Sequence, residues 1–251
     1  MLTHPTYEKL QDLRLTGMLK ALQEQDNASD VDSLTFEERL GLLLDREATE
    51  RHTRRLKTRL RKAKLRHQAA VEDIDYRHPR RLDKSLTLSL AGCQWIKEHQ
   101  NLIITGPTGI GKTWLACAFA QKACREGYNA LYTRLPRLVQ DIGIARADGR
   151  YPKLMKDLSK TDLLILDDWG LNPLTEEQRR DLLEVLEDRY QIRSTLVTSQ
   201  LPVDKWHEYL SDPTLADAIM DRLVHNAHRM ALEGDSMRKQ KASLTLSKSS
   251  K

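Results

Sequence analysis

The sequence predicts an α/β fold built on a parallel sheet, preceded by an all-helical region. From about residue 90 onward, short apolar runs suited to strands alternate with amphipathic helical patterns. Such an alternation produces a parallel sheet with helices on both faces, which is a three-layer αβα arrangement. Before residue 70, apolar residues recur at helical spacing and no strand-like run is present.

Two helical patterns occupy residues 1–70. Residues 7–25 carry apolar side chains at close to a 3.6-residue period. Thr35 and Glu38 have the spacing of a capping box, so a long helix is expected from Phe36 to about residue 70. Residues 71–90, which contain Pro79 and a polar Ser/Thr alternation, are expected to form a linker.

The remaining elements are expected within residues 91–240. The expected strands are 102–105, 130–133, 163–166, 195–198 and, more weakly, 229–232. The expected helices between them are 113–125, 135–145, 176–190 and 215–226. Residues 241–251 are rich in Ser, Lys and Thr and are expected to be a flexible tail.

Residues 106–113 match the pattern G-x-x-x-x-G-K-[ST] at every position, between an apolar run and a helical pattern. Glycines let the backbone wrap closely and point its N–H groups at phosphate oxygens. Lys112 is expected to reach the β- and γ-phosphates, and the Thr113 hydroxyl to bind Mg²⁺. The predicted nucleotide-binding residues are Gly106, Pro107, Thr108, Gly109, Ile110, Gly111, Lys112 and Thr113.

A second motif supports a nucleotide site of the P-loop type. The apolar run 163–166 ends in Asp167 and Asp168. In a P-loop fold the first carboxylate after such a strand orients Mg²⁺, and the second can polarise the attacking water. Because adjacent strand residues point to opposite faces, the two carboxylates are expected to have different roles.

Polar residues at the end of the next strand are further candidates. One of Thr198, Ser199 and Gln200 is expected to contact the γ-phosphate or the attacking water, since open α/β sheets bind ligands at the carboxyl ends of strands. Arg222 lies on a predicted helix far along the chain. Its chemistry is compatible with an arginine finger across a subunit boundary and with a surface salt bridge.

The charge of the chain is concentrated in one window. The chain has 251 residues with 41 Lys and Arg against 36 Asp and Glu, a net charge of +5. Residues 51–66 hold nine basic and no acidic residues, so the other 32 basic and 36 acidic residues sum to −4. A block of one sign indicates a polyanionic partner. The nine residues are Arg51, Arg54, Arg55, Lys57, Arg59, Arg61, Lys62, Lys64 and Arg66.

On a helix, these cations form two faces beside an apolar stripe of Leu56, Leu60 and Ala63. Residues 1–70 contain only two aromatic residues, whereas single-strand binders stack bases on aromatic side chains, so contacts with the duplex backbone are favoured. A solvated charge run and a membrane-surface helix are the alternatives; the second would need Trp or Phe beside the basic face. Arg150 and Lys153 belong to a weaker basic segment that lines the same DNA path or forms a solvated loop.

Several motifs in order resemble the IstB family, ATPases that assist insertion-sequence transposases and are related to DnaC helicase loaders within the AAA+ class. These motifs are Cys93-Gln-Trp95, residues 102–113, residues 162–170, Arg189-Tyr190, residues 198–202, Trp206, residues 218–223 and residues 234–238. The resemblance implies that Arg222 is an arginine finger acting in trans and that Arg238 is a distal sensor arginine. It also implies slow, switch-like hydrolysis, because Asp168 stands where most AAA+ proteins have a glutamate.

Other classes of protein are disfavoured. No apolar run approaches the roughly 20 residues of a membrane span, and residues 1–10 lack the apolar core of a secretory signal. The three cysteines, Cys93, Cys117 and Cys124, have no C-x-x-C spacing and are interpreted as reduced thiols of a cytoplasmic protein without a disulfide or zinc site.

The predicted function is that of a transposition helper. Bound ATP and Mg²⁺ are expected to drive homo-oligomerisation on double-stranded DNA, and the protein to recruit or activate the transposase of the same element. The alternatives are a replicative helicase loader and a nucleic-acid-binding scaffold that never turns nucleotide over. A small-molecule P-loop kinase is a third, against which the basic helix argues.

Overall fold

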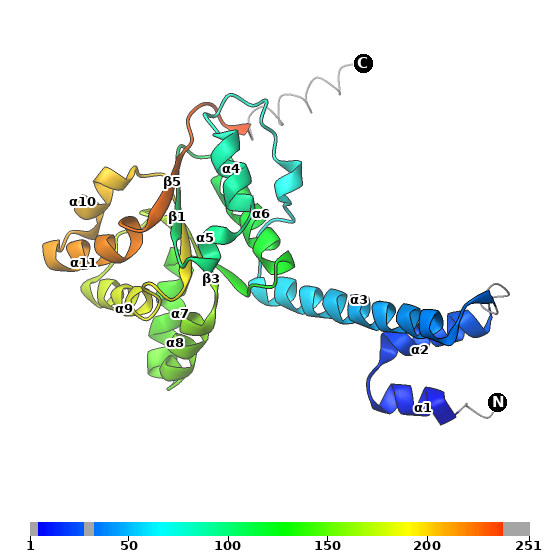
Figure 1. The fold of residues 1–251 in the computed structure, drawn as a ribbon. Coiled ribbons are helices and arrows are strands. Elements are labelled where there is room, and N and C mark those ends of the chain that lie inside the picture. Colours follow the sequence, from blue (N-terminus) through cyan, green and yellow to red (C-terminus); the bar gives the residue numbers. More distant parts are fainter. Residues whose placement is uncertain (1–4, 28–32, 238–251) are drawn as a thin grey trace, which may run out of the picture. The chain divides into compact units, whose positions relative to one another are not determined.

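The structure is a computed structural model that describes residues 5–27 and 33–237 (Figure 1). Contacts between residues divide the chain into two units, residues 1–58 and 59–251. The division falls within helix α3 (Phe36–Ala63), whereas the sequence predicts a boundary at residue 70. The predicted tail, residues 241–251, lies outside the described residues.

The first unit contains α1 (Pro5–Asp12), α2 (Thr16–Asp26) and most of α3. The expected single helix over 7–25 is two helices, because the chain turns between them with Arg14 at φ +56°. The predicted capping box is confirmed: the Thr35 amide donates to the Glu38 carboxylate (2.8 Å), and the Glu38 amide donates to the Thr35 hydroxyl (3.3 Å).

A buried carboxylate holds α2 against α3. Glu47 on α3 is 5% exposed, and its Oε2 accepts from the amides of Gly17 (2.7 Å) and Met18 (3.2 Å) in the first turn of α2. These amides have no partner within their own helix, so the carboxylate both satisfies them and offsets the positive end of the helix dipole. A Cβ on Gly17 would lie 2.6 Å from the Glu47 Cα, so this close approach requires glycine.

Helix α3 ends at Ala63, earlier than the sequence predicts. Lys64 adopts a left-handed conformation (φ +51°), which stops the helix. Residues 64–70 then run as an irregular segment in which Ala69 is buried, and the 3₁₀ turn η2 (Val71–Asp73) follows. No glycine or proline marks this end of the helix in the sequence.

The second unit is built on a five-stranded parallel sheet of order β2-β3-β4-β1-β5. Its strands are β1 (Asn101–Thr105), β2 (Ala130–Arg134), β3 (Leu163–Trp169), β4 (Ser194–Ser199) and β5 (Ala227–Ala231). All five predicted strands are therefore confirmed. The three central strands are buried along almost their whole length, as parallel strands covered on both faces must be.

Helices cover both faces of this sheet (Figure 1). They are α4 (Lys84–Ala91), α5 (Gln94–Lys97), α6 (Lys112–Arg125), α7 (Leu135–Ala147), α8 (Tyr151–Lys160), α9 (Glu176–Glu187), α10 (Trp206–Leu210) and α11 (Pro213–Val224), with the 3₁₀ turn η3 (Val203–Lys205). Helix α6 packs across the sheet on one face. Helices α7, α9 and α11 share a core on the other face with Ile103, Leu164, Leu166 and Val197.

Two segments differ from the sequence-based expectation. Residues 71–90 are not a linker: they include η2 and α4, whose first turn is capped by the Asp83 carboxylate accepting from the Leu86 amide (3.0 Å). Thr87 and Leu90 of this helix are buried. The weaker basic segment holds helix α8, with Met155 facing the core, rather than a solvated loop.

None of the helices in the described residues is both long and apolar enough to cross a lipid bilayer. Cys93, Cys117 and Cys124 are unpaired and buried, and burial raises the pKa of the Cys93 thiol to about 11.

Candidate nucleotide-binding site

The phosphate-binding loop joins the end of β1 to the start of α6. Gly106, Gly109 and Gly111 all have positive φ angles (+146°, +84° and +101°), which side chains other than glycine rarely adopt. A Cβ on Gly109 would lie 2.1 Å from the Ser236 Oγ, and one on Gly111 would lie 2.8 Å from an Arg80 nitrogen. The backbone conformation of the loop therefore requires glycine at these positions, and neighbouring segments lie too close to leave room for side chains there.

Lys112 and Thr113 begin α6, where the backbone amides of the first turn face the loop. Lys112 is 9% exposed, and its ammonium donates to the carbonyls of Gly106 (2.7 Å) and Pro107 (2.9 Å). The Thr113 hydroxyl donates to both carboxylate oxygens of Asp167, at 2.9 and 3.1 Å. The structure therefore brings the two predicted motifs together, although 54 residues separate Thr113 from Asp167 in the chain.

Asp167 is fully buried at the end of β3 and is surrounded by hydroxyl groups. It accepts hydrogen bonds from Thr113, from the Tyr132 hydroxyl (2.6 Å) and from the Thr198 hydroxyl. Burial, followed by this hydrogen bond to Asp167, raises the pKa of Tyr132 well above its ordinary value. An Arg66 guanidinium nitrogen lies 3.9 Å from the Asp167 Oδ2.

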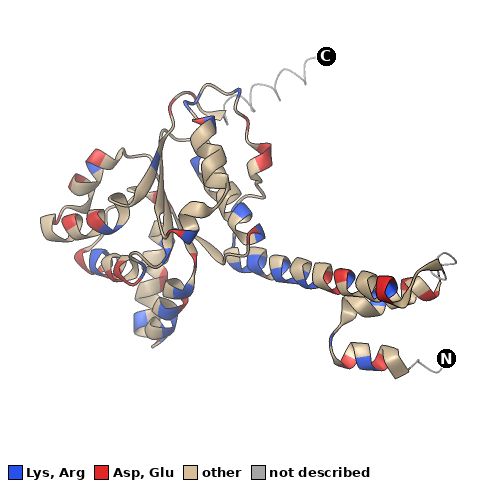
Figure 2. Cartoon of the chain, viewed as in Figure 1, with Lys and Arg blue, Asp and Glu red and all other residues tan. Residues whose placement is uncertain are grey.

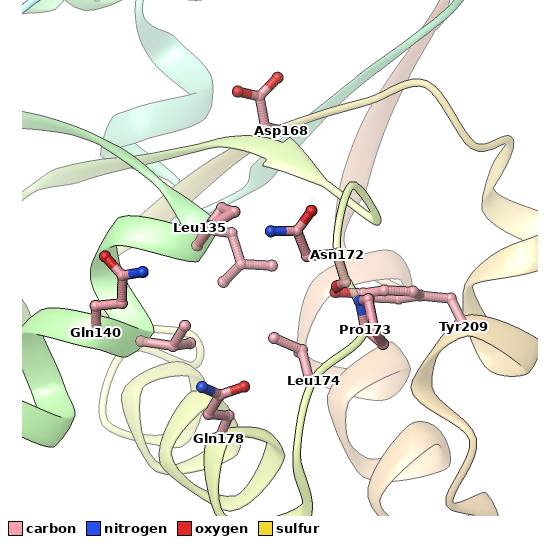
Figure 3. Close-up of a pocket in the computed structure, with 10 residues that line it drawn as sticks. Leu135, Gln140, Asp168, Asn172, Pro173, Leu174, Gln178 and Tyr209 are labelled. Atoms are coloured by element: carbon pink, nitrogen blue, oxygen red, sulfur yellow. The ribbon is translucent and has the colours of Figure 1, made fainter.

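Asp168 has different surroundings from Asp167. Its φ angle is +61°, and its carboxylate accepts from the Arg134 guanidinium at 2.5 Å. It borders a cavity of about 100 Å³ between α7 and residues 172–174, whose polar lining includes Gln140 and Asn172 (Figure 3). The two adjacent carboxylates therefore have separate partners, as expected, although the left-handed backbone at Asp168 and the irregular pairing after Leu166 replace the regular alternation of a strand there.

The three polar candidates at the end of β4 have different partners. Thr198 contacts Asp167, and its Oγ1 also accepts from the Asp168 amide (3.4 Å). The Ser199 hydroxyl donates to the Trp169 carbonyl (2.9 Å) and accepts from the backbone, so it is occupied within the strand end. Gln200 accepts from the hydroxyl of Thr108 (2.7 Å), which places it against the phosphate-binding loop.

Arg222 lies far from this loop within the same chain. Its carbonyl accepts from the side-chain amide of Asn101, the first residue of β1, whereas the loop follows the last residue of that strand. The guanidinium contacts Asp221 (2.9 Å) and Glu187 (3.4 Å) and lies 5.4 Å from the Tyr190 ring centre. Arg238 lies outside the described residues. The Met237 amide, just before it, donates to the Gly109 carbonyl (3.1 Å).

A cavity of about 520 Å³ opens over the loop beside Lys112 and Thr113. Its other lining residues are His67, Asp73, Asp75, Arg80, Gly109, Gly111, Trp114 and Met237. Several come from the segment that the sequence predicts to be a linker, so this wall was missed. The buried Arg80 supports the loop by donating to the Ile110 carbonyl (3.3 Å). No local motif distinguishes it from the neighbouring arginines.

These groups fit an ATP–Mg²⁺ complex. The glycine cradle and the α6 N-terminus supply amides and partial positive charge for phosphates, and Lys112 supplies a full charge. The paired oxygens of Thr113 and Asp167 are the hard ligands that Mg²⁺ prefers. The cavity beside them has room for a nucleoside.

The sheet order, with the phosphate-binding loop directly after strand β1 beside the central strand β4, gives the chain a P-loop fold of the AAA+ type. A solved structure of DnaI superposes with a TM-score of 0.56 at 20% identity, covering 66% of this chain and 91% of that one. The DnaC helicase loader superposes with a TM-score of 0.53 at 20% identity, covering 65% of this chain and 96% of that one. These likenesses establish the fold.

The model of the IstB-like ATP binding protein family matches residues 8–245, and the chain belongs to this family. An insertion-sequence ATP-binding protein of Sinorhizobium fredii is 56% identical over 239 residues, which are 95% of this chain and 98% of the relative. The IS1162 ATP-binding protein of Pseudomonas fluorescens is 51% identical over 203 residues, which are 80% of this chain and 88% of the relative.

The cations predicted to bind DNA fall into two groups. Some have partners: Arg51 donates to Glu47 (2.6 Å), Arg54 donates to Thr16 (2.9 Å), Arg150 pairs with Asp148, and Arg66 lies beside Asp167. Arg59 is half-buried and belongs to neither group. The second group is exposed, and its side chains make no hydrogen bond or ion pair within residues 5–27 and 33–237. Its members are Arg55, Lys57, Arg61, Lys62, Lys64 and Lys153.

Proposed function

We propose that this protein is an ATP-dependent helper of DNA transposition. It binds ATP with Mg²⁺, assembles as a homo-oligomer on double-stranded DNA, and recruits or activates the transposase of its own insertion sequence. The observation that carries this proposal is the phosphate-binding loop with its Thr113–Asp167 pair in a chain that also carries an exposed cationic helix. Membership in a family whose relatives are named for insertion sequences supports it.

The nucleotide is held by the residues that line the loop. Lys112 moves from the loop carbonyls to the β- and γ-phosphates, for which a full negative charge is a better partner than a carbonyl dipole. Thr113 and Asp167 hold the metal ion, which supplies charge neutralisation to the phosphates when it is bound. Thr198 orients the Asp167 carboxylate, and Gln200 faces the loop from the neighbouring strand.

Hydrolysis is proposed to be slow. Asp168 would orient the attacking water, but its carboxylate is paired with Arg134, and its side chain is one methylene shorter than that of glutamate. This ion pair holds the carboxylate toward Arg134, so it must be released before it can orient a water molecule. ATP turnover then serves as a timer for assembly.

The DNA contacts are proposed for exposed cations that have no side-chain partner in the described residues, namely Arg55, Lys57, Arg61 and Lys62 on α3 and Lys64 directly after it. Figure 2 shows Lys and Arg gathered along the part of α3 that leads to its C-terminal end. Side chains of one sign along one helix repel one another, and phosphates relieve that repulsion. With few aromatic residues in this region, the contacts are to the backbone of a duplex. Lys153 on α8 is a further candidate.

Oligomerisation is proposed to complete the ATP site. Within one chain, Arg222 lies at the amino end of β1, whereas the loop follows its carboxyl end, so its guanidinium is proposed to reach the phosphates of another copy. An arginine supplied in this way stabilises the charge that develops on the transferred phosphoryl group.

Arg222→Ala should therefore lower ATPase activity at least about 100-fold, since an arginine finger contributes roughly 10³–10⁵ in rate. ATP binding by the monomer should change by less than about threefold, because the variant keeps its own loop. Turnover and nucleotide affinity measured on the same preparation test this. Arg180→Ala, which removes an exposed arginine of α9, is the matched control.

A mixture of subunits gives the sharper test. Lys112→Ala subunits lack ATP binding but keep Arg222, whereas Arg222→Ala subunits keep ATP binding. If the arginine acts in trans, mixing the two inactive variants restores part of the activity. Wild-type activity in Arg222→Ala, or no recovery on mixing, contradicts the role.

A further inference from the structure

Arg66 is the basic residue of the 51–66 window that the structure places at the nucleotide site. The chain leaves helix α3 at Lys64, whose left-handed conformation turns the following residues toward α6. The Arg66 guanidinium then lies 3.9 Å from the buried Asp167 carboxylate and beside the hydroxyl of Tyr132. The side chain is 46% exposed, so it also faces solvent.

Arg66 reaches the carboxylate beside which a metal ion and a terminal phosphate would be bound. The large cavity over the loop is lined by Asp73, Asp75 and Arg80 and by Lys112 and Thr113. Thr113 contacts Asp167, so the metal ion and the terminal phosphate belong beside these two residues. His67, the next residue after Arg66, also lines this cavity. Arg66 is therefore next to the expected position of the γ-phosphate through its contact with Asp167.

The other cations near this end have different positions. Arg134 is paired with Asp168, and Lys112 serves both the β- and the γ-phosphate from the loop side. Arg66 approaches the Asp167 carboxylate on the face of the sheet that α6 covers. The same carboxylate also accepts hydrogen bonds from the hydroxyls of two threonines and of Tyr132. A terminal phosphate offers a guanidinium two oxygens in a forked geometry, which a crowded carboxylate cannot.

We propose that Arg66 contacts the γ-phosphate in cis and makes the site distinguish ATP from ADP. The contact ties the segment directly after the basic helix to the state of the nucleotide. This inference rests on the proposed function of the site as an ATP site. It assigns Arg66 to nucleotide recognition rather than to the DNA-binding surface.

The experiment compares the full-length protein with Arg66→Ala, Arg66→Lys and Arg61→Ala. Calorimetric titrations with the Mg²⁺ complexes of ADP and of a non-hydrolysable ATP analogue give two affinities for each protein. Arg66→Ala should lower the preference for the triphosphate about tenfold, while its affinity for ADP changes less than about twofold, because only the γ-phosphate contact is lost. Arg66→Lys keeps the positive charge but lacks the two-pronged guanidinium, so its preference for the triphosphate should lie between those of the wild type and Arg66→Ala.

Arg61→Ala is the matched control, since Arg61 is an exposed arginine of the same window without a partner in the described residues. It should leave the nucleotide preference unchanged. It should reduce by about 0.9 the magnitude of the slope of the logarithm of the duplex association constant against the logarithm of salt concentration. Arg66→Ala should lower the nucleotide preference and leave that slope unchanged. Tyr132→Phe removes a hydroxyl beside Arg66 and should shift the preference in the same direction by a smaller factor, which decides the question if Arg66→Ala fails to fold.

The outcomes separate the inference from the function on which it rests. If the wild type binds neither nucleotide, the proposed function fails. If the wild type prefers the triphosphate and Arg66→Ala keeps that preference, or loses both affinities equally, the inference fails alone. If Arg66→Ala matches Arg61→Ala in DNA binding with an unchanged preference, Arg66 is a DNA contact.

Discussion

Lys112→Ala should weaken ATP binding about 100-fold or more. Truncating one partner of a buried, hydrogen-bonded charge pair costs roughly 2–5 kcal/mol, and 1.4 kcal/mol is a factor of ten. Lys112 is 9% exposed and lies over the loop at the start of α6. The remaining loop amides bind phosphate without its full charge. Titration of a fluorescent ATP analogue measures the loss directly.

Lys122→Ala is the matched control for this substitution. Lys122 lies on the same helix and pairs with Glu126 (2.5 Å) away from the loop, so its removal leaves the nucleotide site intact. Lys112→Ala should retain the melting temperature of the wild type, since the carbonyls of Gly106 and Pro107 that its ammonium contacts belong to a loop that is partly open to water. Equal nucleotide affinity in Lys112→Ala and the wild type would contradict an ATP site at this loop.

Duplex DNA affinity should fall steeply as salt is added. If about six phosphates are engaged, the logarithm of the association constant falls by roughly five per tenfold rise in salt. Replacing Lys57, Arg61, Lys62 and Lys64 together by alanine removes four exposed cations of this segment. The magnitude of the slope of log association constant against log salt concentration should then decrease by about 3.6. Affinity should be lost to similar extents for every duplex sequence. Fluorescence anisotropy across a salt series gives both values.

A variant lacking Arg150 is the control for the salt series. Its guanidinium already pairs with Asp148, so Arg150→Ala should change the slope little. A flat salt response of the wild type contradicts the role of α3. A clear preference for single strands over duplex would favour a helicase loader, because single strands bind through a different balance of stacking and charge.

The sequence predicts the chemistry of the site where neighbouring residues carry it. Gly106 to Thr113 need a close turn and a helix N-terminus, both of which are local features with a strong residue preference. Asp167 follows a continuous apolar run that can only be a buried strand. The five strands follow from these signals, and the structure confirms them. The hydrogen bond from Thr113 to Asp167 is a finding of the structure, which brings the two motifs together.

Other features depend on tertiary contacts that no local pattern reports. Arg14 and Lys64 adopt left-handed conformations that end helices without glycine or proline. Helix α4 was missed because its alternating polar residues resemble a linker, although two of its positions, Thr87 and Leu90, are buried. Arg66 belongs by sequence to the cationic block, and only the turn at Lys64 brings it to Asp167.

Electron microscopy of the protein with duplex DNA shows whether ATP controls its assembly on a double helix. Samples are compared with a non-hydrolysable ATP analogue and Mg²⁺, with ADP and Mg²⁺, and without nucleotide. We expect regular protein–DNA oligomers with the analogue and few or none in the other two samples. Identical particles in all three would contradict it.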